Sequence, residues 1–200
     1  MSFPTKRLRR LRISEKMRDL VQETRLSPKD FICPVFVQED LKERVKVESM
    51  TEIERLPLED INGEVQTIID LGIPAIMLFG IPTQKDEAGT SAFDDNGIVQ
   101  KAASQIREKF GDKIVIMADV CLCQFTSTGH CGIISGDKID NDISLDTLSK
   151  IAISLAKSGV DTVSPSAMMD GQVSAIRKAL DEKGFTDVSI MSHSAKHRSN

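Results

Sequence analysis

The amino-acid sequence predicts an α/β fold built on a parallel sheet. Two observations support this prediction: short apolar runs alternate with segments of helical spacing from about residue 31 onwards, and glycines follow most of the helical segments. A strand, a helix and a further strand in this order form a right-handed crossover within one sheet. We therefore expect parallel strands whose carboxyl ends lie side by side.

The composition is that of an ordinary globular chain. Its 200 residues, 40% apolar and 28% charged, suffice for one domain with a substantial core or for part of a larger protein. A net charge of -4 argues against a nucleic-acid partner. Four cysteines, together with the expected lack of a secretory leader and of a membrane span, predict a reducing, cytoplasmic location with no membrane partner.

The first 30 residues are expected to form an N-terminal arm, and residues 31–200 the main domain. Residues 6–12 form a basic cluster, which we interpret as a solvated arm or a subunit contact. A short helix is expected over residues 14–23. Ser14 can cap this helix, because its hydroxyl can accept a hydrogen bond from a free amide of the first turn.

The elements of the main domain follow from apolar periodicity and glycine stops. Strands are expected at residues 31–37, 75–80, 114–120, 162–166 and 188–192. Helices are expected at residues 62–71, 98–110, 147–158 and 173–183, each followed by a glycine. The charged residues 38–61 and the polar residues 83–96 are expected to form loops.

Three of the four cysteines lie close together in the sequence, after the strand expected at residues 114–120. Cys121 and Cys123 are two residues apart, and alternate residues of a strand point the same way, so both sulfur atoms can face one ion. Cys131 follows a polar loop. Three thiolates suit zinc and leave its fourth position open for water or substrate. The alternative is that these cysteines are small buried apolar residues.

Polar residues also collect where the predicted strands end. Asp119, Ser164, Ser166 and Lys196 lie at the carboxyl ends of predicted strands or just beyond them. Both a (β/α)8 barrel and a doubly wound sheet build their sites there, so position alone does not separate these two folds. A lysine in such a place can form a Schiff base with a carbonyl substrate, although most lysines are merely solvated.

Four ordered motifs together resemble the porphobilinogen synthase family, also called 5-aminolevulinate dehydratase. They are Asp119-Val-Cys-Leu-Cys-Gln-Phe-Thr-Ser-Thr-Gly-His-Cys-Gly132, Asp140-Asn-Asp142, Ser164-Pro-Ser-Ala-Met-Met-Asp-Gly171 and Ile190-Met-Ser-His-Ser-Ala-Lys196. The resemblance implies a (β/α)8 barrel of TIM type, here truncated to about five strands, with an arm that packs on neighbouring subunits, usually in a homo-octamer. It also implies the condensation of two 5-aminolevulinate molecules to porphobilinogen, with loss of water, in haem and other tetrapyrrole biosynthesis.

Site residues follow from the same resemblance. The family's catalytic zinc ligands match Cys121, Cys123 and Cys131, and one of its two Schiff-base lysines matches Lys196. Its substrate-pocket residues match Asp119 and Ser166. Magnesium is left open as a further ion.

The sequence departs from the family pattern in several places. Phe125, Thr128 and His193 replace residues that are common there, and the match weakens after Lys196, before the second Schiff-base lysine and the substrate-carboxylate arginines. We therefore expect the N-terminal part of such an enzyme. Two alternatives stay open: a non-catalytic zinc-binding or assembly fragment, and a metal-independent Schiff-base aldolase.

Overall fold

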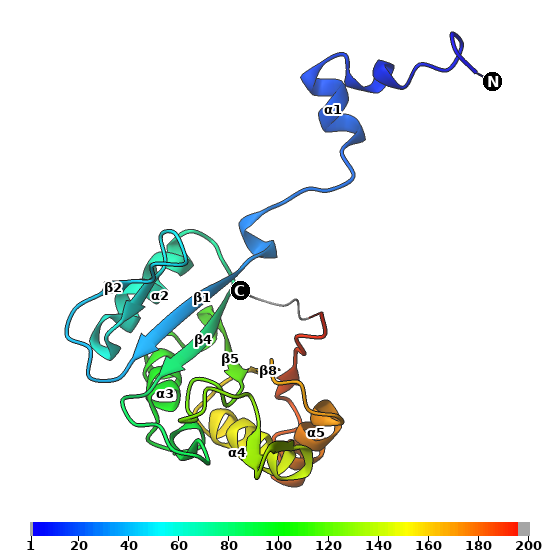
Figure 1. Ribbon diagram of the computed structural model, residues 1–200. Helices are drawn as coiled ribbons and strands as arrows, with labels where there is room; N and C mark the ends of the chain where they lie inside the picture. Colours follow the sequence, from blue (N-terminus) through cyan, green and yellow to red (C-terminus); the bar gives the residue numbers. More distant parts are fainter. Residues whose placement is uncertain (1, 196–200) are drawn as a thin grey trace.

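The computed structural model describes residues 2–195 and shows an α/β body from which an N-terminal segment extends (Figure 1). Seven strands form one sheet in the order β2-β3-β1-β4-β5-β8-β9. These strands are β1 (Ile32–Gln38), β2 (Val45–Lys46), β3 (Glu54–Leu56), β4 (Ala75–Ile81), β5 (Val115–Val120), β8 (Thr162–Pro165) and β9 (Ser189–Ile190). A separate hairpin pairs β6 (Ile133–Ser135) with β7 (Lys138–Asp140).

Five α-helices and five short 3-10 turns complete the described chain. The α-helices are α1 (Glu15–Val21), α2 (Ile61–Asp70), α3 (Ile98–Phe110), α4 (Asn141–Lys157) and α5 (Gln172–Glu182). The 3-10 turns are η1 (Leu8–Arg12), η2 (Pro28–Asp30), η3 (Leu58–Asp60), η4 (Thr90–Ala92) and η5 (Gly111–Lys113). All five strands and all five helices expected from the sequence are present, and α3 has the predicted bounds.

The parallel strands β1, β4, β5, β8 and β9 lie side by side in chain order. A doubly wound sheet reverses its strand order at a switch point, whereas a barrel adds each new strand on the same side. These five strands show no reversal and so follow the order of a barrel, while the short strand β3 also runs parallel to β1, on its other side. The register of β5 and β8 also pairs Asp119 with Ser164.

Helices α2, α3, α4 and α5 lie outside the curved sheet (Figure 1). Alternate strand residues, such as Val37, Leu78 and Ile116, are fully buried in one apolar cluster with residues of these helices. This alternation arises because successive strand side chains point to opposite faces. The other face carries Phe36 and Phe79, whose stacked rings lie 4.9 Å apart between centroids.

The N-terminal segment, residues 2–30, has a different character from the body. Its short helices η1, α1 and η2 contain no buried residues. The predicted cap of α1 is confirmed, because the Met17 amide donates a hydrogen bond to the Ser14 hydroxyl at 3.1 Å. Figure 1 shows this segment projecting away from the sheet and its helices.

Three sequence expectations were wrong in detail. Residues 38–61 are not simply a loop, since they include β2, β3 and η3, and Arg44 forms ion pairs with Asp60 and Glu64 at 2.8 Å each. The hairpin of β6 and β7 was not expected at all. Helix α4 begins at Asn141 instead of residue 147, because the Asp140 carboxylate accepts a hydrogen bond from the Ile143 amide and caps the helix there.

Within residues 2–195, no helix is both long and apolar enough to cross a membrane.

Candidate metal centre

The first two cysteines of the cluster lie in a turn that begins where β5 ends. Strand β5 stops at Val120, and the amides of Phe125 and Thr126 both donate hydrogen bonds to the Leu122 carbonyl at 2.9 Å. The sulfur atoms of Cys121 and Cys123 lie 3.4 Å apart. The predicted proximity is therefore confirmed, but its expected reason, strand alternation, was wrong, because a turn brings the two sulfur atoms together.

The third cysteine completes a compact trio. The sulfur atoms of Cys121, Cys123 and Cys131 all lie within 4.8 Å of one another. A tetrahedral zinc ion with Zn–S bonds of about 2.3 Å needs sulfur atoms roughly 3.8 Å apart, so these three thiols fit a zinc ion. Among the residues that the structure describes, no other group of three His, Cys, Asp or Glu side chains is close enough to hold a metal.

Two of the three thiols are harder to ionise than a free cysteine. Contact with the thiol of Cys121, then with that of Cys131, and finally burial raise the pKa of Cys123. The pKa of Cys121 is also raised: its hydrogen bond with Cys123 acts in the opposite direction, but the contact with Cys131 and burial outweigh it. Cys121 and Cys123 thus resist ionisation because they are buried and lie against other thiols. A divalent cation reverses this by stabilising thiolates.

A close approach of backbone and side chains places Cys131. A Cβ atom on the adjacent Gly132 would lie 2.6 Å from Ile139 Cγ2 and 3.0 Å from Ser144 Oγ, so only glycine fits there. The buried Ser144 hydroxyl accepts a hydrogen bond from the Ile133 amide at 2.8 Å and donates one to the Asp140 carbonyl at 2.6 Å. The start of α4 therefore fixes the chain directly after Cys131.

Asp119 lies in β5, and Ser166 directly follows the neighbouring strand β8, beside the cysteines. Burial raises the pKa of Asp119 to about 6, against hydrogen bonds from Ser166 and Gln124 that lower it. Gln124 Nε2 lies 3.4 Å from the Asp119 carboxylate, whose Oδ1 atom is buried with no hydrogen-bond partner in the described part of the chain. The structure therefore brings Asp119, Ser166 and the cysteine turn together, as their predicted positions at the carboxyl ends of neighbouring strands led us to expect.

Ser164 and Lys196, the other two strand-end residues, have different outcomes. The buried Ser164 hydroxyl donates a hydrogen bond to the Met191 carbonyl at 2.7 Å, which joins β8 to the chain beyond β9. Ser164 thus supports the sheet. Lys196 lies outside the described residues.

Two residues that support the cysteine loop were not singled out from the sequence. Thr126 and Ser144 are both buried, and their hydroxyl groups bond to the backbone on either side of Cys131. Serine and threonine in polar segments are normally solvated, so no sequence signal marked them.

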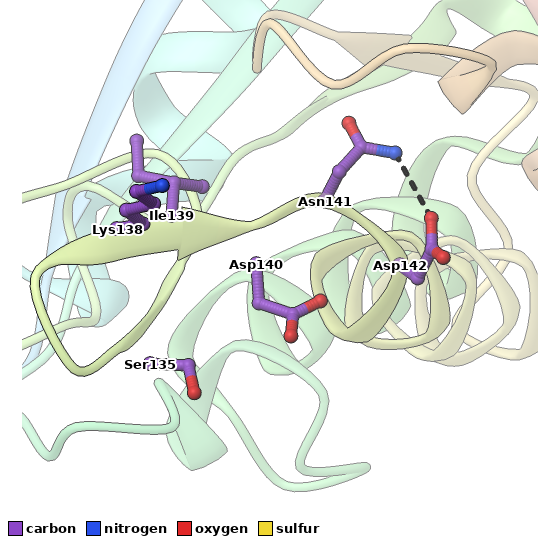
Figure 2. Close-up of a pocket in the computed structure, with 6 residues that line it drawn as sticks. All are labelled: Ser135, Lys138, Ile139, Asp140, Asn141 and Asp142. Atoms are coloured by element: carbon purple, nitrogen blue, oxygen red, sulfur yellow. Dashed lines mark hydrogen bonds between the residues drawn. The ribbon is translucent and has the colours of Figure 1, made fainter.

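A separate hollow of about 390 Å³ lies at the start of α4 (Figure 2). Its lining residues are Ser135, Lys138, Ile139, Asp140, Asn141 and Asp142. Figure 2 shows the Asn141 amide pointing to the Asp142 carboxylate, 3.3 Å away. None of the lining residues is a predicted site residue, so the candidate centre is the cysteine cluster and not this hollow.

Comparisons with known proteins agree with this geometry. The family described as delta-aminolevulinic acid dehydratase matches residues 5–200. Proteins of that name from Archaeoglobus fulgidus and Bacillus subtilis are 48% and 47% identical to this chain over 198 and 199 residues. These alignments cover 99% and 100% of this chain but 61% of each relative, so the chain spans about three fifths of the relatives' length.

A solved structure extends the agreement to the fold. It is the crystal structure of delta-aminolevulinic acid dehydratase (porphobilinogen synthase) from Toxoplasma gondii, in complex with the reaction product porphobilinogen. The TM-score is 0.93 at 39% sequence identity, and the match covers 98% of this chain and 56% of that one. The sheet described above therefore corresponds to part of that enzyme.

Proposed function

Because this chain belongs to the delta-aminolevulinic acid dehydratase family, we propose that it supplies the metal-binding part of an enzyme that condenses two 5-aminolevulinate molecules to porphobilinogen. The observation that carries this proposal is the trio of thiols within 4.8 Å of one another, directly after β5. The reaction belongs to haem and other tetrapyrrole biosynthesis and releases water.

In this proposal Cys121, Cys123 and Cys131 hold a zinc ion as thiolates. When bound, zinc supplies a Lewis acid that polarises a carbonyl oxygen. Three protein ligands leave one position for water or substrate, as in other catalytic zinc sites. The thiols must stay reduced to bind the ion, which supports a cytoplasmic location.

The neighbouring polar residues are proposed to bind and orient substrate. Ser166 and Gln124 donate to the Asp119 carboxylate, and this arrangement leaves Asp119 Oδ1 able to accept a hydrogen bond from a substrate amine. Burial of Asp119 excludes water from this contact and strengthens it. Asp119 and Ser166 therefore act as substrate-binding residues.

Lys196 is proposed to bind one substrate molecule covalently. Its neutral amine adds to the ketone carbon of 5-aminolevulinate, and the carbonyl oxygen then leaves as water to give an imine. This imine holds the substrate while the second molecule is positioned at the cysteine side.

Assembly through the N-terminal segment is a further part of the proposal. We regard residues 1–30 as an arm and residues 31–200 as a barrel-type domain. The arm exposes apolar side chains that a second copy of the chain can cover, as in a homo-octamer: Phe3, Leu8, Leu11, Ile13, Leu20 and Leu26.

Borohydride trapping of 5-aminolevulinate on the purified chain tests the function. Peptide mass spectrometry is expected to find a reduced adduct on Lys196. The adduct should be absent in Lys196→Arg and retained in the matched control Lys183→Arg, which alters an exposed lysine. A zinc assay on the same samples should find one ion per chain.

The same experiment separates the alternatives. Bound zinc without an adduct would favour a zinc-binding or assembly fragment. An adduct that forms without zinc and ignores chelators would favour a metal-independent aldolase. If the chain formed no adduct and also bound no zinc, the proposed function would be contradicted altogether.

A further inference from the structure

Thr126 lies midway in the loop between Cys123 and Cys131 and is only 1% exposed. Its hydroxyl oxygen lies 3.0 Å from the His130 carbonyl oxygen and 3.2 Å from that of Leu122. We propose that Thr126 is a positioning residue that holds Cys131 against Cys121 and Cys123. This inference rests on the zinc site proposed above and adds a residue to it that is not a ligand.

The two hydroxyl contacts join the two parts of the chain that carry the sulfur atoms. Leu122 lies between the first two cysteines, and His130 directly precedes the third. One side chain therefore spans the loop from within. The Ser144 hydroxyl holds the chain directly after Cys131, whereas the Thr126 hydroxyl joins the residue before Cys131 to the turn that carries the other two cysteines.

Backbone contacts fix the position of this hydroxyl. The Thr126 amide donates to the Leu122 carbonyl at 2.9 Å, and its carbonyl accepts from the Gly129 amide at 3.2 Å. Thr126 also forms a parallel bridge with Asp86 in the loop after β4, and the Ser127 amide donates to the Asp86 carbonyl at 2.9 Å. The loop after β4 thus holds the backbone of the cysteine loop in place.

The methyl group of Thr126 is packed as well as its hydroxyl. A Cβ atom on Gly89 would lie 3.4 Å from Thr126 Cγ2, which shows that the methyl group packs against the loop after β4. The neighbouring Leu122 and Phe125 are buried as well. Without the hydroxyl, the Leu122 carbonyl would keep the amides of Phe125 and Thr126 as donors, whereas the His130 carbonyl would lose its contact with Thr126. The end of the loop that carries Cys131 would therefore be held less firmly.

The test compares zinc affinity across four variants of the full 200-residue chain, measured by competition with a chromogenic chelator. Thr126→Val keeps the shape of the side chain but removes its hydroxyl. The zinc dissociation constant of this variant should rise about 10- to 100-fold, the range seen when residues that orient metal ligands are removed. Thr126→Ser keeps the hydroxyl and should stay within about 3-fold of the parent chain.

The matched control is Thr147→Val. Thr147 is also buried, and its hydroxyl donates to the Ile143 carbonyl at 3.1 Å within α4, away from the cysteine loop. Its zinc affinity should be unchanged. Thr126→Ala removes the hydroxyl without adding a methyl group, and it replaces Thr126→Val if that variant fails to fold.

A second measurement, the absorption of bound cobalt, separates a change in ligand geometry from a general loss of stability. In the cobalt-substituted chain, the thiolate-to-cobalt absorption should weaken or shift in Thr126→Val while the circular dichroism of the metal-free chain stays the same. Equal zinc affinity in Thr126→Val and the parent chain would overturn the inference, and so would an equal loss in Thr147→Val. A parent chain that binds no zinc would instead refute the proposed metal site, and the role of Thr126 with it.

Discussion

Two connections that follow parallel strands of this sheet are stabilised in opposite ways. Residues 39–53, after β1, are held by Arg44, whose ion pairs with Asp60 and Glu64 are partly solvated. Residues 121–132, after β5, are held by buried hydroxyl groups and by a glycine that allows close contact. Exposed ion pairs contribute about 0–1 kcal/mol each, whereas an unpaired buried polar group costs about 1–3 kcal/mol.

This difference shows where the chain needs accurate geometry. The connection after β1 even places Asp40 and Glu52 at φ angles of 56° and 63°, which suit glycine better. The connection after β5 has glycine at its positive-φ position, Gly129. Changes in the cysteine loop should therefore have larger effects than changes in residues 39–53, and the following predictions test that order.

The largest effect is expected from Cys123→Ser. A serine hydroxyl is a much poorer zinc ligand than a thiolate. Zinc affinity should therefore fall by more than the ~100-fold that is typical when a residue orienting a ligand is removed. Chelator competition measures this. The control is Cys33→Ser, because Cys33 lies in β1 outside the trio and should leave zinc affinity unchanged. Equal losses in both variants would contradict the assignment.

Gly132→Ala should lower the free energy of unfolding by about 2 kcal/mol, because its Cβ atom would overlap Ile139 and crowd Met169 and Ser144. Urea unfolding measures the change. The matched control has the opposite sign: Gly63 lies exposed in α2 with nothing within 4 Å of an added Cβ atom, so Gly63→Ala should stabilise by roughly 0.5–1 kcal/mol. A stabilised Gly132→Ala variant would show that the loop yields easily.

Asp119→Asn should stabilise the metal-free chain at neutral pH. Because the folded pKa of Asp119 is raised from 3.8 to about 6, the folded state binds more protons than the unfolded state between these values. Stability contributed by this group is therefore lost as pH rises through that window. The free energy of unfolding of Asp119→Asn should exceed that of the parent chain by on the order of 2 kcal/mol at pH 7 and should equal it near pH 3.5.

Urea unfolding of the metal-free chain across this pH range measures the effect. Asp137→Asn, in the exposed turn between β6 and β7, is the control and should show no such pH-dependent gain. If the gain of Asp119→Asn over the parent chain were the same at pH 3.5 and at pH 7, burial of the carboxylate would not be its cause.

The smallest effect is expected in residues 39–53. Glu52→Gly should raise the free energy of unfolding by at most about 1 kcal/mol, because relief of the left-handed backbone is partly offset by the greater freedom of glycine in the unfolded chain. Thermal unfolding measures it, with zinc affinity expected to stay constant. A change in zinc affinity would show that the two connections are coupled.

Much of the fold and part of the site were predictable from the sequence. Helix α3 and the strands β1, β4 and β5 followed from apolar patterns over six or more residues, and the shorter β8 and β9 from apolar runs that come soon after the glycine ending a helix. The short strands β2, β3, β6 and β7 were missed, since two or three residues carry no period and form strands only through their partners. The start of α4 was missed because Asp140 was interpreted as part of a motif and not as a helix cap.

The sequence by itself determined the alternation of strands and helices, the choice of three thiols as candidate ligands and the placement of Asp119 and Ser166 at strand ends. These features depend on residue type and local spacing. Only the tertiary structure decided that a turn brings Cys121 and Cys123 together, that Gly132 packs against α4, and that Thr126 is buried. The reason is physical: a hydroxyl positions a loop only when other segments exclude water from it, and those segments are distant in the sequence.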